Sequence, residues 1–528
     1  MKRLCELEFV HRFVAALPAD PDIRNVTRLV GDACYSLVEP TPVSAPRLLC
    51  WSEDLAAELG VARPNAPEGD DPDIRILAGN ALARGMRPWA ARYGGHQFGH
   101  WADQLGDGRA ISLGERVTED GKTFELQLKG AGRTPYSRHA DGRAVLRSSL
   151  REFLCSEAMH GLGVPTTRAL SLVGTGESVV RDMFYDGNPR AEPGAIVCRV
   201  SPSFVRFGNF EIHAARGEHA TLLRLADFVI ARHFPNIDPA DPRRHAQWFR
   251  EVCERTAVMV AHWMRVGFVH GVMNTDNMSI LGITLDYGPY GWLERWDPSW
   301  TPNTTDAAGR RYAYARQPQI AAWNLARLAA ALRSLIDDET VLHAALEHYG
   351  ATFEATHARM TADKLGLSQL EEHRDLEWLE EMYELLAASD ADVPVFFRQL
   401  ARRHQQPACA FSAILADACA VLPEGALLQR WHGWFDAYDG RIRVDHASGD
   451  HAMRQARMNL SNPLYLPRNY LSHQAIEALE QGDSAPLETL LRIMRDPYRA
   501  ARGAENFAMR RPEWARDKAG CSALSCSS

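Results

Sequence analysis

The stretch VHGVMNTDNMSILGITLDYG, residues 269–288, decides how the fold is interpreted. Two short apolar segments, 278–281 and 283–285, flank Gly282 and predict a β-hairpin. Folding the chain back at this turn would carry Asp286 toward the polar residues that precede the first segment. The alternative is a buried hairpin that binds nothing.

The polar residues at the open end of this predicted hairpin form a candidate metal site. Asp276 and Asn277 precede the first apolar segment, and Asp286 follows the second. Carboxylate and amide oxygens suit Mg²⁺ or Mn²⁺, whose remaining ligands are water and phosphate oxygens. The sequence therefore predicts a divalent cation that is bound together with phosphate groups.

The order of these residues is similar to that of the catalytic segments of protein kinases. Those enzymes carry a His-Arg-Asp loop that ends in a metal-binding Asn, followed by Asp-Phe-Gly. His270 and Asn277 keep the outer spacing of the loop, and Asp286 begins Asp-Tyr-Gly. Val272 stands in place of the catalytic Asp. An apolar side chain cannot accept a proton, so ordinary kinase chemistry at that position is excluded.

The whole-chain properties set limits on partners and location. The chain has 528 residues, 46% of them hydrophobic, and a net charge of −8. This length allows two to four domains, and the charge does not favour nucleic acid or an anionic membrane as a partner. No apolar run approaches the roughly 18 residues of a membrane span. Glu6 and Glu8 interrupt any signal-peptide core, so a cytoplasmic location is expected.

Lys129 is one of only five lysines among 59 basic residues. It ends the segment 123–129, whose alternation predicts a half-buried strand, and its ammonium group can reach phosphate oxygens. The segment 145–155 has helical spacing, and Glu152 lies off its apolar stripe. Glu152 is a candidate partner for Lys129, as in kinases. The alternatives are a solvent-facing lysine at a strand end and an exposed glutamate.

Glycines and arginines around Lys129 predict a phosphate site. Gly106, Gly108 and Arg109 lie about twenty residues before it, where glycine lets backbone amides approach phosphates. Asp141 and Gly142 form the tightest turn of the loop that follows. Taken alone, these patterns are also typical of simple turns.

Two further arginines lie in apolar, strand-like surroundings. Arg199 and Arg206 need an anionic partner there, because an unpaired buried guanidinium is costly. Either one alone fits a structural ion pair. Together with Arg109 and Lys129, they would suit a triphosphate.

These motifs, in this order, resemble the selenoprotein O family, whose members have a kinase-like fold and act as protein adenylyltransferases. The resemblance extends from Arg92 through the segments 286–291, 462–463 and 468–470 to the Cys-Ser-Ser end. It implies that ATP is bound in an orientation that presents its α-phosphate to an acceptor. It also implies metal ligands at Asn277 and Asp286, a proton acceptor at Asp276 and pairing of Lys129 with Glu152. The implied nucleotide contacts are Gly106, Gly108, Arg109, Lys129, Asp141, Gly142, Arg199, Arg206 and Asp286.

The redox feature of the family is where this chain departs from the pattern. Cys526 matches the family's terminal cysteine or selenocysteine, which in some members forms a disulfide with a loop after the Asp-Phe-Gly segment. The corresponding loop here, residues 296–306, contains no cysteine. The remaining options for Cys526 are Cys521, a redox partner in another molecule, or no disulfide.

The expected fold is α+β, with a kinase-like arrangement of two lobes. Its expected divisions are a terminal extension (1–88), a small nucleotide-binding lobe (89–212), a large helical lobe (213–500) and a tail (501–528). The leading functional hypothesis is AMP transfer from ATP to protein Ser, Thr or Tyr hydroxyls. The alternatives are γ-phosphate transfer, which Val272 disfavours, and a silent nucleotide-binding redox module.

Overall fold

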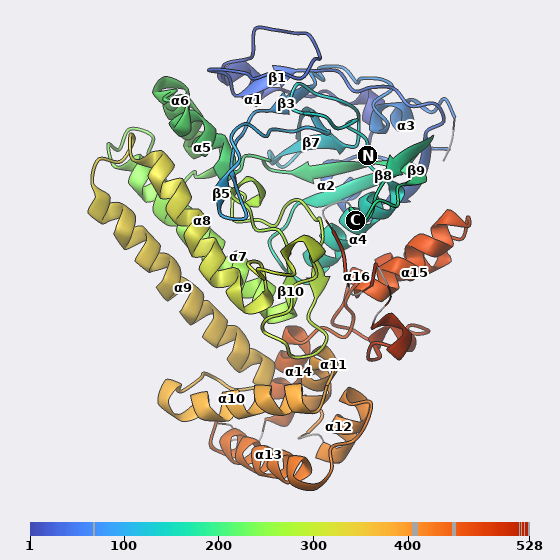
Figure 1. Ribbon diagram of the computed structural model, residues 1–528, viewed down its shortest axis with the longest axis vertical. Helices are drawn as coiled ribbons and strands as arrows, with labels where there is room; N and C mark the ends of the chain where they lie inside the picture. The colour runs from blue at the N-terminus through green and yellow to red at the C-terminus, as the bar shows by residue number, and fades with distance from the viewer. Residues whose placement is uncertain are drawn as a thin grey trace.

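The computed structural model describes residues 1–66, 69–403, 410–445, 450–516, 518, 520–521 and 523–525. Figure 1 shows a sheet-bearing part built largely from the first 200 residues, with a helical part below and beside it. The expected combination of a sheet-bearing part and a helical part is confirmed. None of the helices in the described part of the chain has the length and apolar character needed to cross a membrane.

The central sheet has seven antiparallel strands in the order β1-β3-β6-β7-β9-β8-β2. Both edge strands come from the first 88 residues, so the segment expected as an extension is built into the sheet. The strands are β1 (Tyr35–Leu37), β2 (Arg47–Trp51), β3 (Trp89–Ala91), β6 (Ala110–Val117), β7 (Thr123–Lys129), β8 (Arg168–Arg181) and β9 (Arg190–Ser201). Two further pairs join β4 (His96–Gln97) to β5 (His100–Trp101) and β10 (Phe268–Val269) to β11 (Gly291–Trp292).

Strand β7 lies where it is expected, but the prediction that it is half-buried is wrong. Leu126 and Leu128 pack on one face against residues of the first 88. Glu125 and Gln127, the polar members of the alternation, are also buried. The reason is that both faces of the sheet are covered, so the polar side chains of β7 must find partners inside the molecule.

Helix α4 lies against the other face of the sheet and carries Glu152. Its residues Leu150, Phe153 and Leu154 pack with strands β8 and β9 and with α15 and α16. Glu152 is itself buried, because it points toward the sheet. The helices of the sheet-bearing part are α1 (Arg12–Ala16), α2 (Glu53–Leu59), α3 (Pro72–Leu77) and α4 (Leu146–Gly161).

The rest of the chain is mainly helical. Helices α5 to α9 share one hydrophobic core, and α10 to α13 share another at the bottom of Figure 1. The bounds are α5 (Phe207–Ala215), α6 (His219–His233), α7 (Arg244–Val266), α8 (Gln317–Leu332), α9 (Glu339–Leu365), α10 (Glu372–Ala388), α11 (Val393–Leu400), α12 (Phe411–Ala418), α13 (Gly425–Asp445), α14 (His451–Ser461), α15 (Asn469–Glu480) and α16 (Ala485–Met494).

The predicted hairpin in residues 278–285 is wrong. Gly282 does form a turn, but the two apolar segments do not pair with each other. Ser279 instead bridges Arg206, and Thr284 bridges Thr166. Each segment therefore makes backbone hydrogen bonds to another part of the chain, and the two segments stay apart.

The C-terminal tail docks on the loop that the sequence analysis compares with the family's redox loop. The amide of Leu524 donates to the carbonyl of Pro302 at 2.9 Å, and the amide of Thr304 donates to the carbonyl of Leu524 at 2.7 Å. Cys521 is a buried free thiol. Cys526 lies outside the described residues, so its predicted redox contact stays a prediction.

Candidate active site

Lys129 and Glu152 form a largely buried ion pair between the end of β7 and the second turn of α4. The ammonium nitrogen lies 2.6 Å from a carboxylate oxygen. Burial lowers the pKa of Lys129, against the effect of the nearby carboxylates of Glu152 and Asp286. The antiparallel register of β7 with β9 brings Arg199 to the same place, and its guanidinium also contacts Glu152 at 3.2 Å.

Three cationic side chains converge on the carboxylate of Asp286. Arg199 binds one oxygen, Arg206 binds the other, and the ammonium group of Lys129 lies 3.6 Å away. Burial opposes ionisation, but these charges hold the pKa of Asp286 well below its usual range. Three of the four cations predicted for phosphate thus form one cluster with the predicted metal ligand Asp286, and the four residues come from four separate segments.

Asp276 lies next to this cluster in a single turn of 3₁₀ helix, Thr275–Asn277. Its carbonyl accepts a hydrogen bond from Arg206 at 2.8 Å, and its Oδ2 accepts one from Gln97 at 3.2 Å. Its Oδ1 is buried and has no hydrogen-bond partner among the described residues. Burial raises the pKa of Asp276 to about 7. A carboxyl group with that pKa suits proton transfer near neutral pH.

Asn277 and Asp286 offer the oxygen donors that a small divalent cation needs. The Asn277 amide nitrogen donates to the carbonyl of Val272 at 2.9 Å, which leaves the amide oxygen for another partner. The described residues contain no cluster of three or more His, Cys, Asp or Glu side chains arranged to hold a metal. Two protein ligands are few, as expected for a cation that is bound largely by water and phosphate oxygens.

The apolar residue at the kinase base position is buried in the loop. Val272 is 7% exposed, and its amide donates to His270 at 3.4 Å. His270 in turn lies 3.1 Å from the carbonyl of Leu285, the residue before Asp286. His270 therefore ties the two ends of the loop together, while Val272 offers no group for proton transfer.

A cavity of about 400 Å³ lies on the outer side of the site. Three of the predicted nucleotide residues, Arg109, Asp141 and Gly142, line it. The amide of Gly130 donates to the carbonyl of Arg109 at 2.7 Å, so the cavity adjoins the end of β7 that carries Lys129. The Asp141 carboxylate is bound by the guanidinium of Arg181 at 2.6 Å. The remaining lining residues are Arg133, His139, Ala140, Arg143, Val145, Ser148, Arg181 and Tyr185.

Gly106 and Gly108 have a packing reason to be glycine. A side chain at Gly106 would clash with the ring of Tyr136, and the backbone there is left-handed with φ 88°. A Cβ on Gly108 would lie 3.0 Å from the carbonyl of Tyr136. The close approach that the glycines allow is therefore to the loop after β7, a contact that the sequence alone did not suggest.

Two buried residues behind the cluster were missed by the sequence analysis. Gln127 accepts a hydrogen bond from Arg199 and donates to Asp107 at 3.3 Å. Asp107 also lies 3.9 Å from Arg206. Only their positions in the sequence could have identified them: Asp107 lies between two glycines, and Gln127 is the third residue from the end of a strand.

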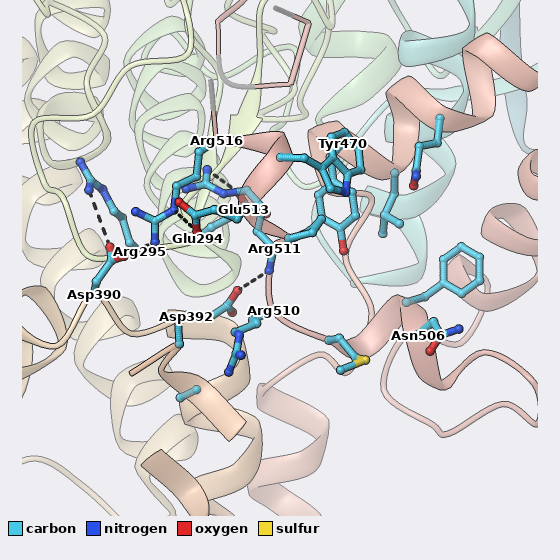
Figure 2. A pocket seen from close by; sticks show the side chains of 18 residues that line it. Glu294, Arg295, Asp390, Asp392, Tyr470, Asn506, Arg510, Arg511, Glu513 and Arg516 are labelled. Carbon is cyan, nitrogen blue, oxygen red and sulfur yellow. Dashed lines mark hydrogen bonds and ion pairs between the residues drawn. The ribbon is translucent and has the colours of Figure 1, made fainter. Parts of the chain in front are cut away.

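Figure 2 shows a different cavity, of about 610 Å³, between the C-terminal segment, the residues just before α11, the end of α12 and helix α15. The residues described as lining it include none of those predicted for the site. Its buried acids already have cationic partners: Glu294 lies 2.8 Å from Arg511, and Asp392 binds Arg468. The convergence of charges at Asp286 therefore marks the better candidate for an active site.

The cationic cluster, the oxygen donors and the buried carboxyl group together define an enzyme that transfers a phosphorus-containing group. A family model described as protein adenylyltransferase SelO matches residues 21–495. The chain is 55% identical to a protein from Nitrosospira multiformis, over 99% of this chain and 97% of that one. It is 56% identical to proteins from Aromatoleum aromaticum (98% and 99%) and Xanthomonas euvesicatoria (99% and 100%). Each of the three is named protein nucleotidyltransferase YdiU.

The chain belongs to the SelO family of protein adenylyltransferases, and the resemblance to selenoprotein O is confirmed. It is an enzyme of the nucleotidyltransferase class.

Proposed function

We propose that this enzyme transfers the AMP part of ATP to the hydroxyl oxygens of Ser, Thr or Tyr side chains in proteins and releases pyrophosphate. One observation carries the proposal. Lys129, Arg199 and Arg206 converge on Asp286 beside a buried carboxyl group at Asp276, while Val272 fills the kinase base position.

The cationic cluster is proposed to hold the triphosphate. Two guanidinium forks and one ammonium group offer the charge-assisted hydrogen bonds that phosphate oxygens accept. Arg109 extends this charge into the 400 Å³ cavity, which has room for the outer phosphates. The proposed nucleotide-binding residues are Gly106, Gly108, Arg109, Lys129, Asp141, Gly142, Arg199, Arg206 and Asp286.

Asn277 and Asp286 are proposed to bind Mg²⁺ or Mn²⁺ together with ATP. A cation held there would neutralise charge on the phosphate oxygens. The amide oxygen of Asn277 and the carboxylate of Asp286 fit this role, because both are hard oxygen donors and Asp286 lies among the phosphate-binding groups.

Asp276 is proposed to receive the proton of the acceptor. The hydroxyl oxygen attacks the α-phosphorus, and its proton passes to Oδ1 of Asp276, which has no partner among the described residues. The bond from the α-phosphorus to the oxygen that bridges to the β-phosphate breaks, and pyrophosphate leaves with the electron pair. Arg199, Arg206 and Lys129 stabilise the negative charge that develops on the leaving group.

The finer features of the architecture remain part of the proposal. The strand lysine, its helix glutamate and the metal aspartate support a kinase-like arrangement, with the divisions 1–88, 89–212, 213–500 and 501–528. The described cysteines are free thiols, which is typical of a reducing compartment and supports a cytoplasmic location. A redox partner acting through Cys526 is also proposed.

Labelled ATP tests the proposal directly. The enzyme is incubated with α-labelled or γ-labelled ATP and a cell extract, and label is measured on the extract proteins and on the enzyme itself. Label from the α position alone is expected. Label from the γ position alone would overturn the proposal, and intact ATP binding with no label would favour a silent module.

Two variants sharpen this test. Asp286→Asn should lower transfer by about a thousandfold or more, because it replaces the anionic metal ligand with a neutral amide and removes the charge that orders the cations. Asp120→Asn, in the exposed turn between β6 and β7, is the matched control and should behave as the wild type. Near-normal transfer by Asp286→Asn would contradict the proposal that Asp286 binds the metal ion.

A further inference from the structure

The β4–β5 hairpin is hydrogen-bonded to the loop that carries Asp276. The amide of His96 donates to Thr275 Oγ1 at 2.7 Å, and Gln97 Nε2 donates to Asp276 Oδ2 at 3.2 Å. The amide of Phe98 donates to Asn274 Oδ1 at 3.2 Å. Three consecutive residues of the hairpin thus bind three consecutive residues of the loop. Figure 1 shows β5 reaching from the sheet-bearing part to the helical part, where this contact is made.

The backbone next to the hairpin is pressed directly against Asp276. A Cβ on Gly95 would lie 3.0 Å from both Cβ and Oδ1 of Asp276. A Cβ on Gly208, at the start of α5, would clash with the carbonyl of Gly94. No larger residue fits at these glycines without moving the carboxyl group or the hairpin, so the distance between them is fixed by close packing.

Other contacts hold the hairpin rigidly in this place. His96 Nδ1 lies 2.6 Å from a carboxylate oxygen of Glu211 in α5. The ring of Phe98 packs on that of Tyr312, whose hydroxyl accepts from the Phe98 amide at 2.9 Å. The hairpin is therefore anchored on both sides of Gln97, and this fixes the Gln97 side chain next to Asp276.

We infer that Gln97 positions the carboxyl group of Asp276, holding Oδ2 and leaving Oδ1 as the atom that receives the acceptor proton. The inference rests on the proposed function of Asp276. A neutral amide suits this role, because it donates one hydrogen bond, which fixes the orientation, and adds no charge that would weaken the carboxylate as a base. Gln97 acts through Asp276, so it is a positioning residue.

The first measurement is steady-state transfer from α-labelled ATP by the variant Gln97→Met, with the enzyme itself and cell-extract proteins as acceptors. Methionine keeps the length of the side chain and removes the donor. Loss of a hydrogen bond to a charged group predicts that kcat falls about tenfold to a hundredfold. The KM for ATP should stay within about twofold, because Gln97 contacts none of the proposed nucleotide residues among the described contacts. His100→Ala, at an exposed position of β5 in the same hairpin, is the control and should keep normal kcat.

A double-mutant cycle shows whether the effect passes through Asp276. In the background of Asp276→Asn, Gln97→Met should lower kcat no further, because the group that it positions is gone. Equal fold losses in both backgrounds, an unchanged kcat for Gln97→Met, or a loss confined to the KM for ATP would each overturn the inference. Thermal unfolding of each variant identifies a loss that comes from misfolding, and Gln97→Leu then serves as the second apolar variant.

The cycle also separates this inference from the proposal on which it rests. Normal transfer by Asp276→Asn would remove Asp276 as the proton acceptor, and the role of Gln97 would fall with it. Impaired transfer by Asp276→Asn together with normal transfer by Gln97→Met would overturn the inference alone.

Discussion

At the scale of single residues, Asp286 is the most informative side chain, because it binds three cations in the structure and is also proposed to bind the metal ion. Its carboxylate binds Arg199, Arg206 and Lys129, which are also the groups proposed for the triphosphate. Asp286 therefore stands where a phosphate would stand, and it adds a counter-charge to that of Glu152, which pairs with Lys129 and Arg199. Binding of ATP must redistribute these contacts before Asp286 can hold a metal.

This exchange predicts that Mn²⁺ and nucleotide bind together. Water proton relaxation should change little when Mn²⁺ is mixed with the enzyme alone, because three cations occupy Asp286. Adding ATP to Mn²⁺ and enzyme should enhance water proton relaxation beyond the level seen for Mn²⁺ and ATP without enzyme. Asp286→Asn should abolish this additional enhancement. Strong enhancement by Mn²⁺ and wild-type enzyme without nucleotide would contradict this account.

Glu125 gives a second prediction at this scale, on stability and pH. Burial raises the pKa of Glu125 to about 8 from an ordinary value near 4.5. The folded state then holds a proton that the unfolded state releases, so the free energy of unfolding should fall as pH rises from about 4.5 to 8. The slope from this one group is at most about 1.4 kcal/mol per pH unit.

Glu125→Gln should remove that slope, because glutamine carries no proton to lose. Urea unfolding at pH 5 and pH 7.5 should show a stability advantage of the variant that grows with pH. Glu119→Gln, at an exposed position between β6 and β7, is the control and should follow the wild type. A difference that is constant across pH would show that Glu125 is ionised in the folded protein.

At the scale of elements, the register of the sheet builds the site. Ser112, Gln127 and Arg199 lie opposite one another on β6, β7 and β9. Their side chains share hydrogen bonds, and the last of them reaches Asp286. A one-residue slip of any strand would turn the polar side chain that it contributes to the opposite face of the sheet. Correct pairing of the strands therefore also assembles the site.

The loop before β6 shows the same dependence on packing, and Gly106 tests it. Gly106→Ala should lower the free energy of unfolding even without nucleotide, because the methyl group would meet the ring of Tyr136. Gly121→Ala is the matched control, since its φ of 82° is also left-handed but the space around it is open. The control should lower the free energy of unfolding by about 1 kcal/mol, and Gly106→Ala should lower it by about 1 to 3 kcal/mol more. Equal costs would mean that Tyr136 moves aside.

At the scale of the whole molecule, the two ends of the chain complete the sheet-bearing part and connect it to the rest. The first 88 residues supply both edge strands of the sheet. The tail binds the loop at Pro302 and Thr304 in the helical part, and the hydroxyl of Ser525 donates to the carbonyl of Met183 in the turn between β8 and β9. The tail therefore contacts both parts of the molecule through hydrogen bonds and needs no disulfide to do so.

Detaching the tail should release the loop without unfolding the protein. Leu524 is buried, and Leu524→Asp should expel it because an unpaired buried carboxylate is costly. Hydrogen exchange at the Thr304 amide should then accelerate, since that amide donates to Leu524. Val421→Asp, at a position 77% exposed, is the control. Unchanged exchange at Thr304 in Leu524→Asp would show that the loop is held by other contacts.

The sequence by itself determined the family, the mixed composition of helices and sheet, and the residue types of the candidate site. The order of the motifs indicates the family, because His270, Asn277 and Asp286 lie close together in the chain and their spacing can be seen in the sequence. The strand that ends at Lys129 and the helix that carries Glu152 were also predicted, since each depends on a short periodic pattern.

Only the tertiary structure decided which partners these segments take. The predicted hairpin after Met278 does not form, because Ser279 and Thr284 find better-placed backbone partners on Arg206 and Thr166. The convergence of three cations on Asp286 and the contact of Gln97 with Asp276 join residues that are 80 to 179 positions apart. Such contacts depend on the register and packing of whole elements, which no local pattern in the sequence contains.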